Sequence, residues 1–192
     1  MIRGFHMDFD PHVNFIVGKN GSGKSAIVNG VTAKLNEKTF RSVAVLDGDD
    51  VRTFLSSELG FSKEHRDLNI QRIGYVSSLV NQAGGVVLTA AIAPYRDTRD
   101  KARRLVEQSG ADFVEVFVDA PVETCESRDV KGLYRLARQG KIPNFTGVSD
   151  PYEAPISPDI QIHTDSLSLT ESVDLIVQYL EEHNYITVSS SS

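Results

Sequence analysis

The sequence predicts a three-layer α/β fold, in which a parallel five-stranded sheet lies between two layers of helices. Short apolar segments alternate with longer segments of helical periodicity along most of the chain, and this alternation is typical of parallel sheets. One of these segments, VVLTAA, is apolar almost without interruption, as expected for a strand buried on both faces. A chain of 192 residues with 40% hydrophobic residues is long enough for one such domain.

The individual elements follow from the apolar pattern. Strands are expected at 13–17, 42–46, 86–91, 113–118 and 160–163. Helices are expected before residue 35, over 64–82, over 96–108 and near the C-terminus, each from apolar residues at helical spacing. The last helix has the clearest signal, because Ser168 and Glu171 form a capping-box pattern ahead of an apolar stripe. The residues of this stripe are Leu169, Val173, Ile176, Val177 and Leu180.

The chain is predicted to form a single domain over residues 1–186, followed by a flexible tail at 187–192 that ends in four serines. One stretch within the domain, 131–158, is rich in glycine, proline and charge and has little periodicity. Long irregular stretches inside a compact domain are usually functional. We therefore predict that this stretch is a lid over the functional site.

The composition narrows the possible functions. The formal net charge is −6, whereas general nucleic-acid binding requires a basic surface, so we predict no nucleic-acid partner. Cys125 is the only cysteine, which excludes an intrachain disulfide and a cysteine-rich metal site. The first residues contain no long apolar stretch, and no segment approaches the ~20 apolar residues of a membrane span. These features predict a cytoplasmic protein without membrane contact.

A glycine-rich loop follows the first predicted strand and opens the first predicted helix. It reads GKNGSGKS and fits the nucleotide-binding pattern G-x-x-x-x-G-K-[ST] in the expected context. Glycines let backbone N–H groups turn toward phosphate oxygens, and the helix N-terminus adds partial positive charge. We expect Lys24 to reach the β- and γ-phosphates and Ser25 to bind Mg²⁺ through its hydroxyl. The pattern predicts a P-loop NTPase fold that binds Mg·ATP through Gly18, Asn20, Gly21, Ser22, Gly23, Lys24, Ser25 and Ala26.

The N-terminal segment has a resemblance of its own. The run HVNFIVGKNGSGKSAIV resembles the first phosphate loop of structural-maintenance-of-chromosomes ATPases and related repair ATPases. Those proteins also carry an ABC-type signature and an acidic Walker B strand, and the sequence contains neither. The resemblance ends near Ala33, and a graft, an engineered chimera and drift in a widely shared loop are all compatible with it.

The remainder of the chain, over about residues 43–186, resembles adenylylsulfate (APS) kinases. The resemblance rests on LDGDDVR, LGFS, HRDLNIQRIG, APYRDTRDKAR, RDVKGLYRLARQGKIPNFTG and DPYEAP, which occur in this order. Strings of this length are not expected by chance. Members of this family are P-loop kinases that transfer the γ-phosphoryl group of ATP to the ribose 3′-hydroxyl of APS and so produce PAPS for sulfate assimilation.

The sequence places two carboxylates where the reaction is expected to occur. Asp47 and Asp49 come just after the second predicted strand, at the sheet edge where such folds bind ligands. A carboxylate there can orient a hydroxyl or hold a metal-bound water, and phosphoryl transfer depends mostly on position and charge. Asp47 can instead cap a turn by accepting backbone N–H groups. The resemblance to APS kinases implies Asp49, together with Lys24, as the catalytic residues.

Other residues are candidates for binding an anionic group and for stacking on an aromatic base. Arg52 and Arg66 suit a phosphate or sulfate group, because guanidinium pairs bidentately with such oxyanions. Asn69 falls on the same helical face as Arg66. A lone Phe61 is more often a core residue than a stacking platform. The family resemblance implies that APS contacts Asp49, Arg52, Phe61, Arg66, Asn69, Ile92, Ala93, Lys131 and Phe145, with adenine between the two phenylalanine rings. It also makes Arg128 a candidate for contact with ATP.

Three further residues have an ambiguous role, and two regions differ from the sequence pattern of the family. Tyr95, Arg96 and Arg99 can brace the sheet edge or contact nucleotide, and we favour bracing. Some family members have a serine, proposed as a phosphorylated intermediate, where this chain has Ala93, so a phosphoserine at this position is excluded. Family phosphate loops usually read G-L-S-G-x-G-K-[ST]-T, and here residues 19, 20 and 26 differ.

Four interpretations remain open from the sequence. The first is an active APS kinase, for which the resemblance implies a homodimer. The second is a P-loop kinase for another small nucleotide or sugar, against which the strings KGLY and DPYEAP argue. The third is a catalytically weak nucleotide-binding domain, derived from or associated with an ATP sulfurylase fusion. The fourth is a fragment of a DNA-repair ATPase, which the acidic composition disfavours.

Overall fold

The strands form one parallel sheet. The computed structural model describes residues 12–39, 41–129 and 131–186. Within these residues a five-stranded sheet has the order β2-β3-β1-β4-β5, and every neighbouring pair is parallel. The strands are β1 (His12–Val17), β2 (Val43–Asp47), β3 (Val86–Ala90), β4 (Asp112–Asp119) and β5 (Ile160–His163). The predicted fold class is therefore confirmed.

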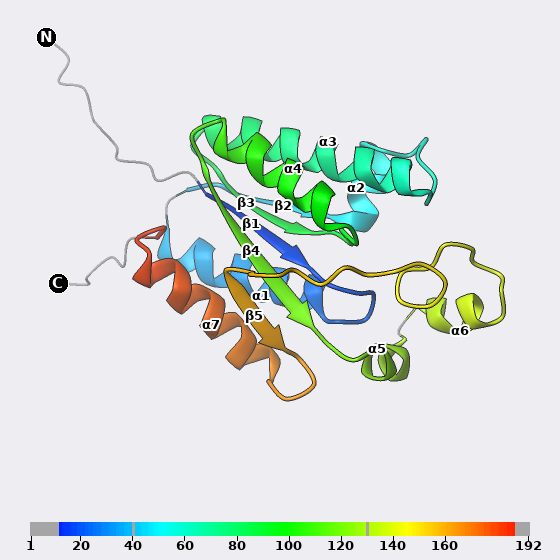
Figure 1. The fold of residues 1–192 in the computed structure, drawn as a ribbon. Coiled ribbons are helices and arrows are strands. Elements are labelled where there is room, and N and C mark those ends of the chain that lie inside the picture. The colour runs from blue at the N-terminus through cyan, green and yellow to red at the C-terminus, as the bar shows by residue number, and fades with distance from the viewer. Residues whose placement is uncertain (1–11, 40, 130, 187–192) are drawn as a thin grey trace, which may run out of the picture.

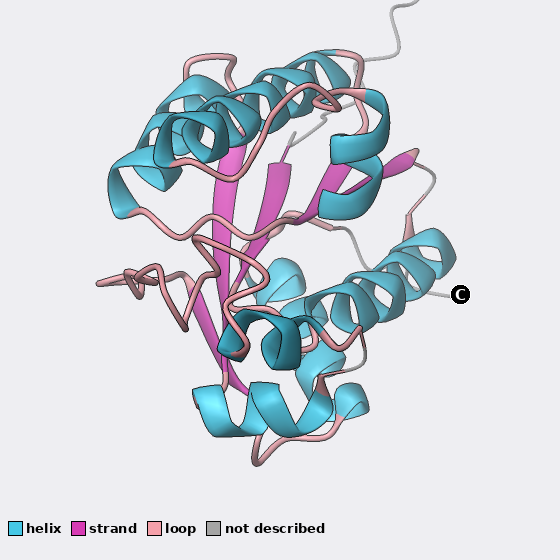
Figure 2. Ribbon diagram, turned by 90° about the vertical axis from the view of Figure 1, so that its right-hand side faces the viewer, coloured by secondary structure: helices cyan, strands magenta, loops and turns pink. Residues whose placement is uncertain are grey.

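Helices cover both faces of this sheet. They are α1 (Lys24–Lys38), α2 (Gly48–Phe54), α3 (Lys63–Gln82), α4 (Arg96–Glu107), α5 (Val122–Arg128), α6 (Leu133–Arg138) and α7 (Leu169–Glu182). Figure 1 shows α3 and α4 on one face and α1 and α7 on the other, and Figure 2 shows the strands between these two layers. None of the helices in the described residues is long and apolar enough to cross a membrane.

The core is divided by the sheet because successive side chains of a strand point to opposite faces. Ile16 packs with α1 and α7 through Leu35 and Ile176. Its neighbour Phe15 packs on the other side with Ile73 of α3 and with Phe113, whose ring centroid is 5.1 Å away. β3 is buried along its whole length, as its continuous apolar sequence predicts. Two apolar layers therefore fix β1 and the loop that follows it.

The last helix confirms most of its predicted pattern. Both halves of the capping box are present between Ser168 and Glu171, and four of the five stripe residues are buried. Leu169 differs, because it is the first residue of α7 and is 51% exposed. The apolar face begins one turn later, where the helix reaches the sheet.

The short helices α2 and α6 were not predicted. α2 starts directly after β2, where the side chain of Asp47 accepts a hydrogen bond from the Asp49 N–H and caps the helix. α6 lies inside the stretch 131–158, which the sequence suggested was irregular. Both helices are too short to produce a clear apolar period. The predicted tail at 187–192 lies outside the described residues.

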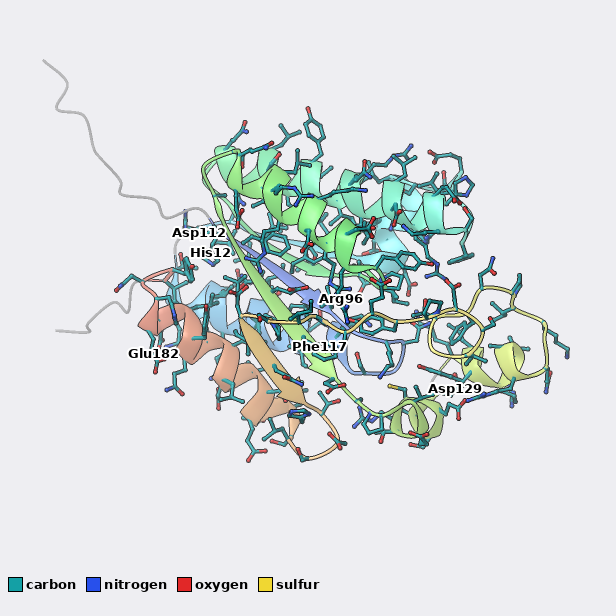
Figure 3. All side chains as sticks on the ribbon, in the orientation of Figure 1. His12, Arg96, Asp112, Phe117, Asp129 and Glu182 are labelled. Carbon is teal, nitrogen blue, oxygen red and sulfur yellow. The ribbon has the colours of Figure 1, made fainter. Side chains whose placement is uncertain are left out.

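The topology determines where a ligand can bind. β1 lies in the middle of the sheet, with β3 and β2 on one side and β4 and β5 on the other. The strand order therefore reverses at β1, where the chain crosses from β3 to β4. Ligands of such sheets bind at the carboxyl ends of the strands near this reversal. In Figure 3, His12 and Asp112 mark the amino ends of β1 and β4, and Asp129 lies toward the opposite end, beyond β4. The loop after β1 and the α5–α6 region meet at that end.

Candidate active site

A pocket of about 600 Å³ opens at the carboxyl ends of the central strands. Its walls come from the phosphate loop, from α2 and the start of α3, from the end of β3, and from the α5–α6 region. Most of the predicted site residues meet here, namely Asn20, Gly21, Gly23, Lys24, Ser25, Ala26, Asp49, Arg52, Phe61, Arg66, Asn69, Ile92, Arg128 and Lys131. Residues separated by more than a hundred positions in the sequence thus share one cavity.

The phosphate loop has a backbone that only glycine can supply at key positions. Gly21 and Gly23 have φ of 71° and 101°, in the left-handed region. A Cβ at Gly18 would lie 2.5 Å from the carbonyl oxygen of Val118. Gly23 is also the N-cap of α1 and provides no side-chain cap. The first N–H groups of α1 are therefore free of a side-chain acceptor at the edge of the pocket, an arrangement that suits an anion.

Lys24 is nearly buried within this loop. Its Nζ donates to the carbonyl oxygens of Gly18 and Lys19, at 3.0 and 2.7 Å. Burial lowers the pKa of Lys24 to about 8, although the carboxylates of Asp47 and Asp49 act against this shift. A partly desolvated cation that is held only by carbonyl oxygens is well suited to exchange them for phosphate oxygens.

Ser25 and Asp47 form the part of the pocket that fits a magnesium ion. The Ser25 Oγ donates to Oδ2 of Asp47 at 2.8 Å, and Oδ1 of the same carboxylate accepts the Asp49 N–H at 3.0 Å. Mg²⁺ prefers oxygen ligands and is usually bound through one or two protein oxygens, waters and phosphates. A hydroxyl and a carboxylate in contact at the phosphate-loop helix match this donor set. Asp47 therefore caps α2, which is one of the roles that the sequence left open, and its other oxygen lies beside Ser25, where a metal-bound water would bind.

Asp49 lines the same pocket from α2 and is paired with Lys131. Their side chains form a direct ion pair that links α2 to the start of the stretch 131–158. Both side chains are more than half exposed, so the pair is accessible to ligands and contributes little to stability. The contact places an acidic and a basic group at the mouth of the pocket.

Arg52, Phe61 and Arg66 build a cationic wall around an aromatic ring. The Phe61 ring lies 4.4 Å from the guanidinium carbon of Arg52 and 5.5 Å from that of Arg66. Arg52 also donates to the carbonyl oxygens of Leu59 and Gly60, and Arg66 donates to that of Phe61. Burial lowers the pKa of both guanidinium groups, which nevertheless remain charged at neutral pH because arginine is the most basic side chain in proteins. Phe61 is 54% exposed and is therefore not a core residue.

Asn69 supplies an unsatisfied acceptor in the same wall. It lies one turn after Arg66 on α3 and is buried. Its Oδ1 has no hydrogen-bond partner within the part of the chain that the structure describes. Buried polar atoms are normally paired, so this oxygen is available to a donor group of a ligand in the pocket.

Contacts around the phosphate loop involve residues that the sequence analysis did not single out. Arg128 donates to the hydroxyl and carbonyl oxygens of Thr164 at 3.0 and 2.5 Å, and Thr164 donates to the carbonyl of Ser22. On the opposite side, the Tyr134 hydroxyl donates to the Asn20 carbonyl at 2.9 Å. Tyr134 lies in the string KGLYR, so its resemblance to the family was the available signal.

Four predicted site residues lie outside the pocket lining. Gly18 and Ser22 are covered within the phosphate loop. Ala93 is fully buried, and its carbonyl oxygen accepts a hydrogen bond from Arg99. Phe145 is buried and packs edge-on against Tyr134 with 5.0 Å between ring centroids. The ring of Phe145 therefore does not face Phe61 across the cavity in this structure.

Tyr95, Arg96 and Arg99 brace the fold, as expected, but they do so through β4 and residues 150–154 rather than through an edge strand. Arg99 forms a buried ion pair with Glu115 of β4 at 2.8 Å and donates to the Glu153 carbonyl at 2.7 Å. Arg96 donates to the Ala154 carbonyl, and the Tyr95 hydroxyl donates to Asp150. The start of α4 thus fastens residues 150–154 to the body of the protein.

The fold and the pocket together define a class of protein. The sheet order, the phosphate loop after β1 and the hydroxyl–carboxylate pair beside it are those of a P-loop phosphotransferase. A second wall rich in arginine, with an exposed phenylalanine, faces the phosphate loop and is suited to an anionic, aromatic acceptor molecule.

Comparison with known proteins identifies the family. The sequence model of the adenylylsulphate kinase family matches residues 10–163. An adenylyl-sulfate kinase from Rippkaea orientalis is 51% identical over 90% of this chain and 92% of its own length. The Mycobacterium tuberculosis APS kinase solved in complex with AMPPNP and APS superposes with a TM-score of 0.86, at 40% identity over 90% of this chain and 98% of that one. The chain belongs to the adenylylsulphate kinase family.

The family match also bears on the N-terminal segment and on assembly. It begins at residue 10 and so includes the phosphate loop, which by itself resembles structural-maintenance-of-chromosomes ATPases. A hexameric APS kinase from Thiobacillus denitrificans is 36% identical, with a TM-score of 0.72, and the match covers 93% of this chain but 30% of that one.

Proposed function

We propose that this chain transfers the γ-phosphoryl group of Mg·ATP to the ribose 3′-hydroxyl of adenosine 5′-phosphosulfate (APS) and releases ADP and 3′-phospho-APS (PAPS). One observation carries the proposal: in a member of the adenylylsulphate kinase family, the phosphate loop and an arginine–phenylalanine wall face each other in one pocket. The relative from M. tuberculosis was solved with an ATP analogue and APS together, which supports the same pair of ligands here.

Backbone and side-chain groups of the phosphate loop form the part of the pocket that binds ATP. The N–H groups at the start of α1 and in the glycine-rich loop donate to phosphate oxygens, and Lys24 exchanges its two carbonyl acceptors for phosphate oxygens. Ser25 and Asp47 would hold Mg²⁺, which would neutralise phosphate charge during transfer. Arg128 borders the same side beside Gly21, where it contacts bound ATP.

The APS side positions the acceptor. Arg52 and Arg66 bind the phosphosulfate, and Phe61 stacks on the adenine ring. Asp49 accepts a hydrogen bond from the 3′-hydroxyl and holds it in line with the γ-phosphorus. Phosphoryl transfer depends mainly on alignment and charge, so Asp49 does not need to be a strong base. Ala93 offers no hydroxyl, which excludes a phosphoserine at this position, and direct in-line transfer does not need one.

We further propose that residues 131–158 act as a lid. Two contacts support this: Lys131 pairs with Asp49 across the pocket mouth, and Tyr134 donates to Asn20 of the phosphate loop. Closure of such a segment excludes water and limits hydrolysis of ATP. The predicted adenine clamp between Phe61 and Phe145 requires the segment to rearrange, because Phe145 is buried against Tyr134; the clamp stays a prediction.

The assembly and location of the enzyme are also proposals. A homodimer is supported by exposed apolar side chains on α2 and α3, among which Phe54 is 84% exposed. Measurement of the molar mass by light scattering tests it. Association with an ATP sulfurylase and a cytoplasmic location stay predictions.

A coupled assay of ADP release with Mg·ATP and APS tests the activity. We expect ADP release that depends on APS, with PAPS as the second product, and its loss in Asp49→Ala. The matched control is Asp50→Ala, because Asp50 is also exposed on α2 but lies outside the pocket lining. ATP binding without APS-dependent turnover by the unaltered chain would overturn the proposed activity.

A further inference from the structure

The guanidinium of Arg66 is held from behind, on the side away from the pocket. Arg66 is only 6% exposed. Its Nη2 donates to the carbonyl oxygen of Asn144 at 2.6 Å, and its Nε lies 4.0 Å from Oδ2 of Asp150. Among the described residues, Asp150 is the only carboxylate within ion-pair distance of this buried cation. Both partners belong to the stretch 131–158.

Asp150 also closes the turn that carries those partners. Its N–H donates to the carbonyl of Phe145 at 3.1 Å, and its own carbonyl accepts the N–H of Gly147 at 2.8 Å. Asn144 has a φ of 53°, an uncommon conformation for a residue other than glycine. This conformation directs the Asn144 carbonyl to Arg66. The turn 144–150 therefore has one defined shape, and that shape fits the buried guanidinium.

Tyr95 orients the carboxylate of Asp150. The Tyr95 hydroxyl donates to the same Oδ2 at 2.8 Å, and the tyrosine is buried at the entrance to α4. Burial and the bond to Asp150 raise the pKa of Tyr95 to about 12, so the phenol stays protonated and remains a donor. Tyr95, Asp150 and Arg66 thus form a chain from α4, through the turn, to the pocket wall.

We propose that Asp150 is a positioning residue for APS, which couples the shape of the turn 144–150 to the orientation of the Arg66 guanidinium, with Tyr95 fixing the carboxylate. Asp150 lies outside the pocket lining, so it acts only through Arg66. The inference rests on the proposed function, in which Arg66 binds the phosphosulfate. Binding of APS to Arg66 then stabilises the ordered turn 144–150, and the ordered turn in its place strengthens the binding of APS.

The test compares Asp150→Ala, Asp150→Asn and Tyr95→Phe. Asp150→Ala removes both the carboxylate that faces Arg66 and the acceptor of the Tyr95 hydroxyl. We expect it to raise the KM for APS about tenfold while the KM for ATP changes less than about twofold. Asp150→Asn keeps an acceptor for Tyr95 and should lie in between. Tyr95→Phe should raise the KM for APS less than Asp150→Ala does.

Matched controls separate this role from a general loss of structure. Asp174 is exposed on α7, and Tyr75 is 56% exposed on α3, so Asp174→Asn and Tyr75→Phe should leave both KM values unchanged. An unchanged KM for APS in Asp150→Ala, or equal increases in the KM for APS and for ATP, overturns the proposal.

A second readout does not depend on turnover. Lys141 is exposed just before the turn, and trypsin cleavage after it should be faster in Asp150→Ala than in the unaltered chain. ADP and APS together should slow this cleavage in the unaltered chain but not in the variant. If the unaltered chain is protected but makes no PAPS, the proposed activity fails and the positioning role stands. If cleavage is equal in both proteins with and without ligands, the positioning role fails.

Discussion

The Oγ atom of Ser25 donates a 2.8 Å hydrogen bond to Oδ2 of Asp47, and this bond joins the first turn of α1 to the carboxyl end of β2. The other carboxylate oxygen accepts the N–H of Asp49 and caps α2. One side chain therefore connects the phosphate loop with the helix that carries Asp49. The two oxygens have separable tasks, one toward the metal site and one toward the backbone.

These tasks can be separated by substitution at Asp47. Asp47→Asn keeps an oxygen that can cap α2 but removes the charge beside Ser25. We expect the Mg²⁺ concentration for half-maximal activity to rise by about 10–100-fold, as is typical when a partner of a metal ligand is altered, with little change in melting temperature. Asp47→Ala should in addition lose about 1 kcal/mol of stability with the cap. A Mg²⁺ titration that is the same for Asp47→Asn and the unaltered chain would contradict the metal role.

Lys24 makes the binding of ATP depend on pH. Burial lowers its pKa to about 8 in the free protein, and only the protonated amine pairs with phosphate. The kcat/KM for ATP should therefore fall as the pH rises through about 8, because this quantity reports the free enzyme. Bound phosphates stabilise the ammonium, so kcat should stay level to a higher pH. Equal descending limbs in both profiles would argue against this assignment.

The same shift affects stability. Because the pKa of Lys24 is lower when folded, the unfolded chain binds more protons between about pH 8 and the ordinary value of 10.5. The contribution of Lys24 to the free energy of unfolding should increase with pH across that window, and the cost of burying the ammonium is fully present below it. Lys24→Met should raise the melting temperature of the ligand-free protein at pH 7, by about 2–4 °C for each kcal/mol of that cost, and remove activity. Urea unfolding of the unaltered chain and of Lys24→Met at pH 7 and pH 9 isolates the contribution of Lys24, because both proteins share the tyrosines whose raised pKa lowers stability at higher pH.

Local signals account for what the sequence could predict. The phosphate loop and the capping box of Ser168 depend on neighbours within a few residues, so the pattern contains the geometry. The Lys131–Asp49 pair and the contact of Arg66 with Asn144 join residues 82 and 78 positions apart. Nothing in the local sequence encodes such contacts, and the family resemblance alone brought Asp49 and Lys131 into one site. For the same reason, the burial of Phe145 against Tyr134 was not foreseen.

Phe61 offers a test of stacking that is free of effects on the core. Its ring is half exposed between Arg52 and Arg66. Phe61→Ala should raise the KM for APS by roughly 10–100-fold, because stacking a base on an aromatic ring is worth about 1–3 kcal/mol. The KM for ATP should stay unchanged. Leu175→Ala is the control, since Leu175 is 42% exposed on α7 and lies outside the pocket lining. A similar KM for APS in both variants would mean that Phe61 does not stack on the base.

The ion pair between Arg99 and Glu115 predicts a loss of stability rather than of chemistry. Both side chains are largely buried, at 2.8 Å from Nε to Oε1. Burial raises the pKa of Glu115, and the charge of Arg99 acts against this shift. Arg99→Ala leaves the carboxylate with only the more distant Arg103, and we expect a loss of about 3–5 kcal/mol. Arg104→Ala, on the exposed side of α4, should cost far less.

The pH dependence of this loss identifies its cause. In Arg99→Ala the pKa of Glu115 should rise further in the folded state, so the folded protein binds a proton that the unfolded chain binds only at lower pH. The stability of the variant should then fall as the pH rises through the ordinary range of a glutamate, and its deficit should be largest near neutral pH. Denaturant unfolding at pH 5 and pH 7.5 measures this difference. A deficit that is equal at both values would assign the loss to the bonds that Arg99 makes with the Ala93 and Glu153 carbonyls, since carbonyl oxygens do not titrate.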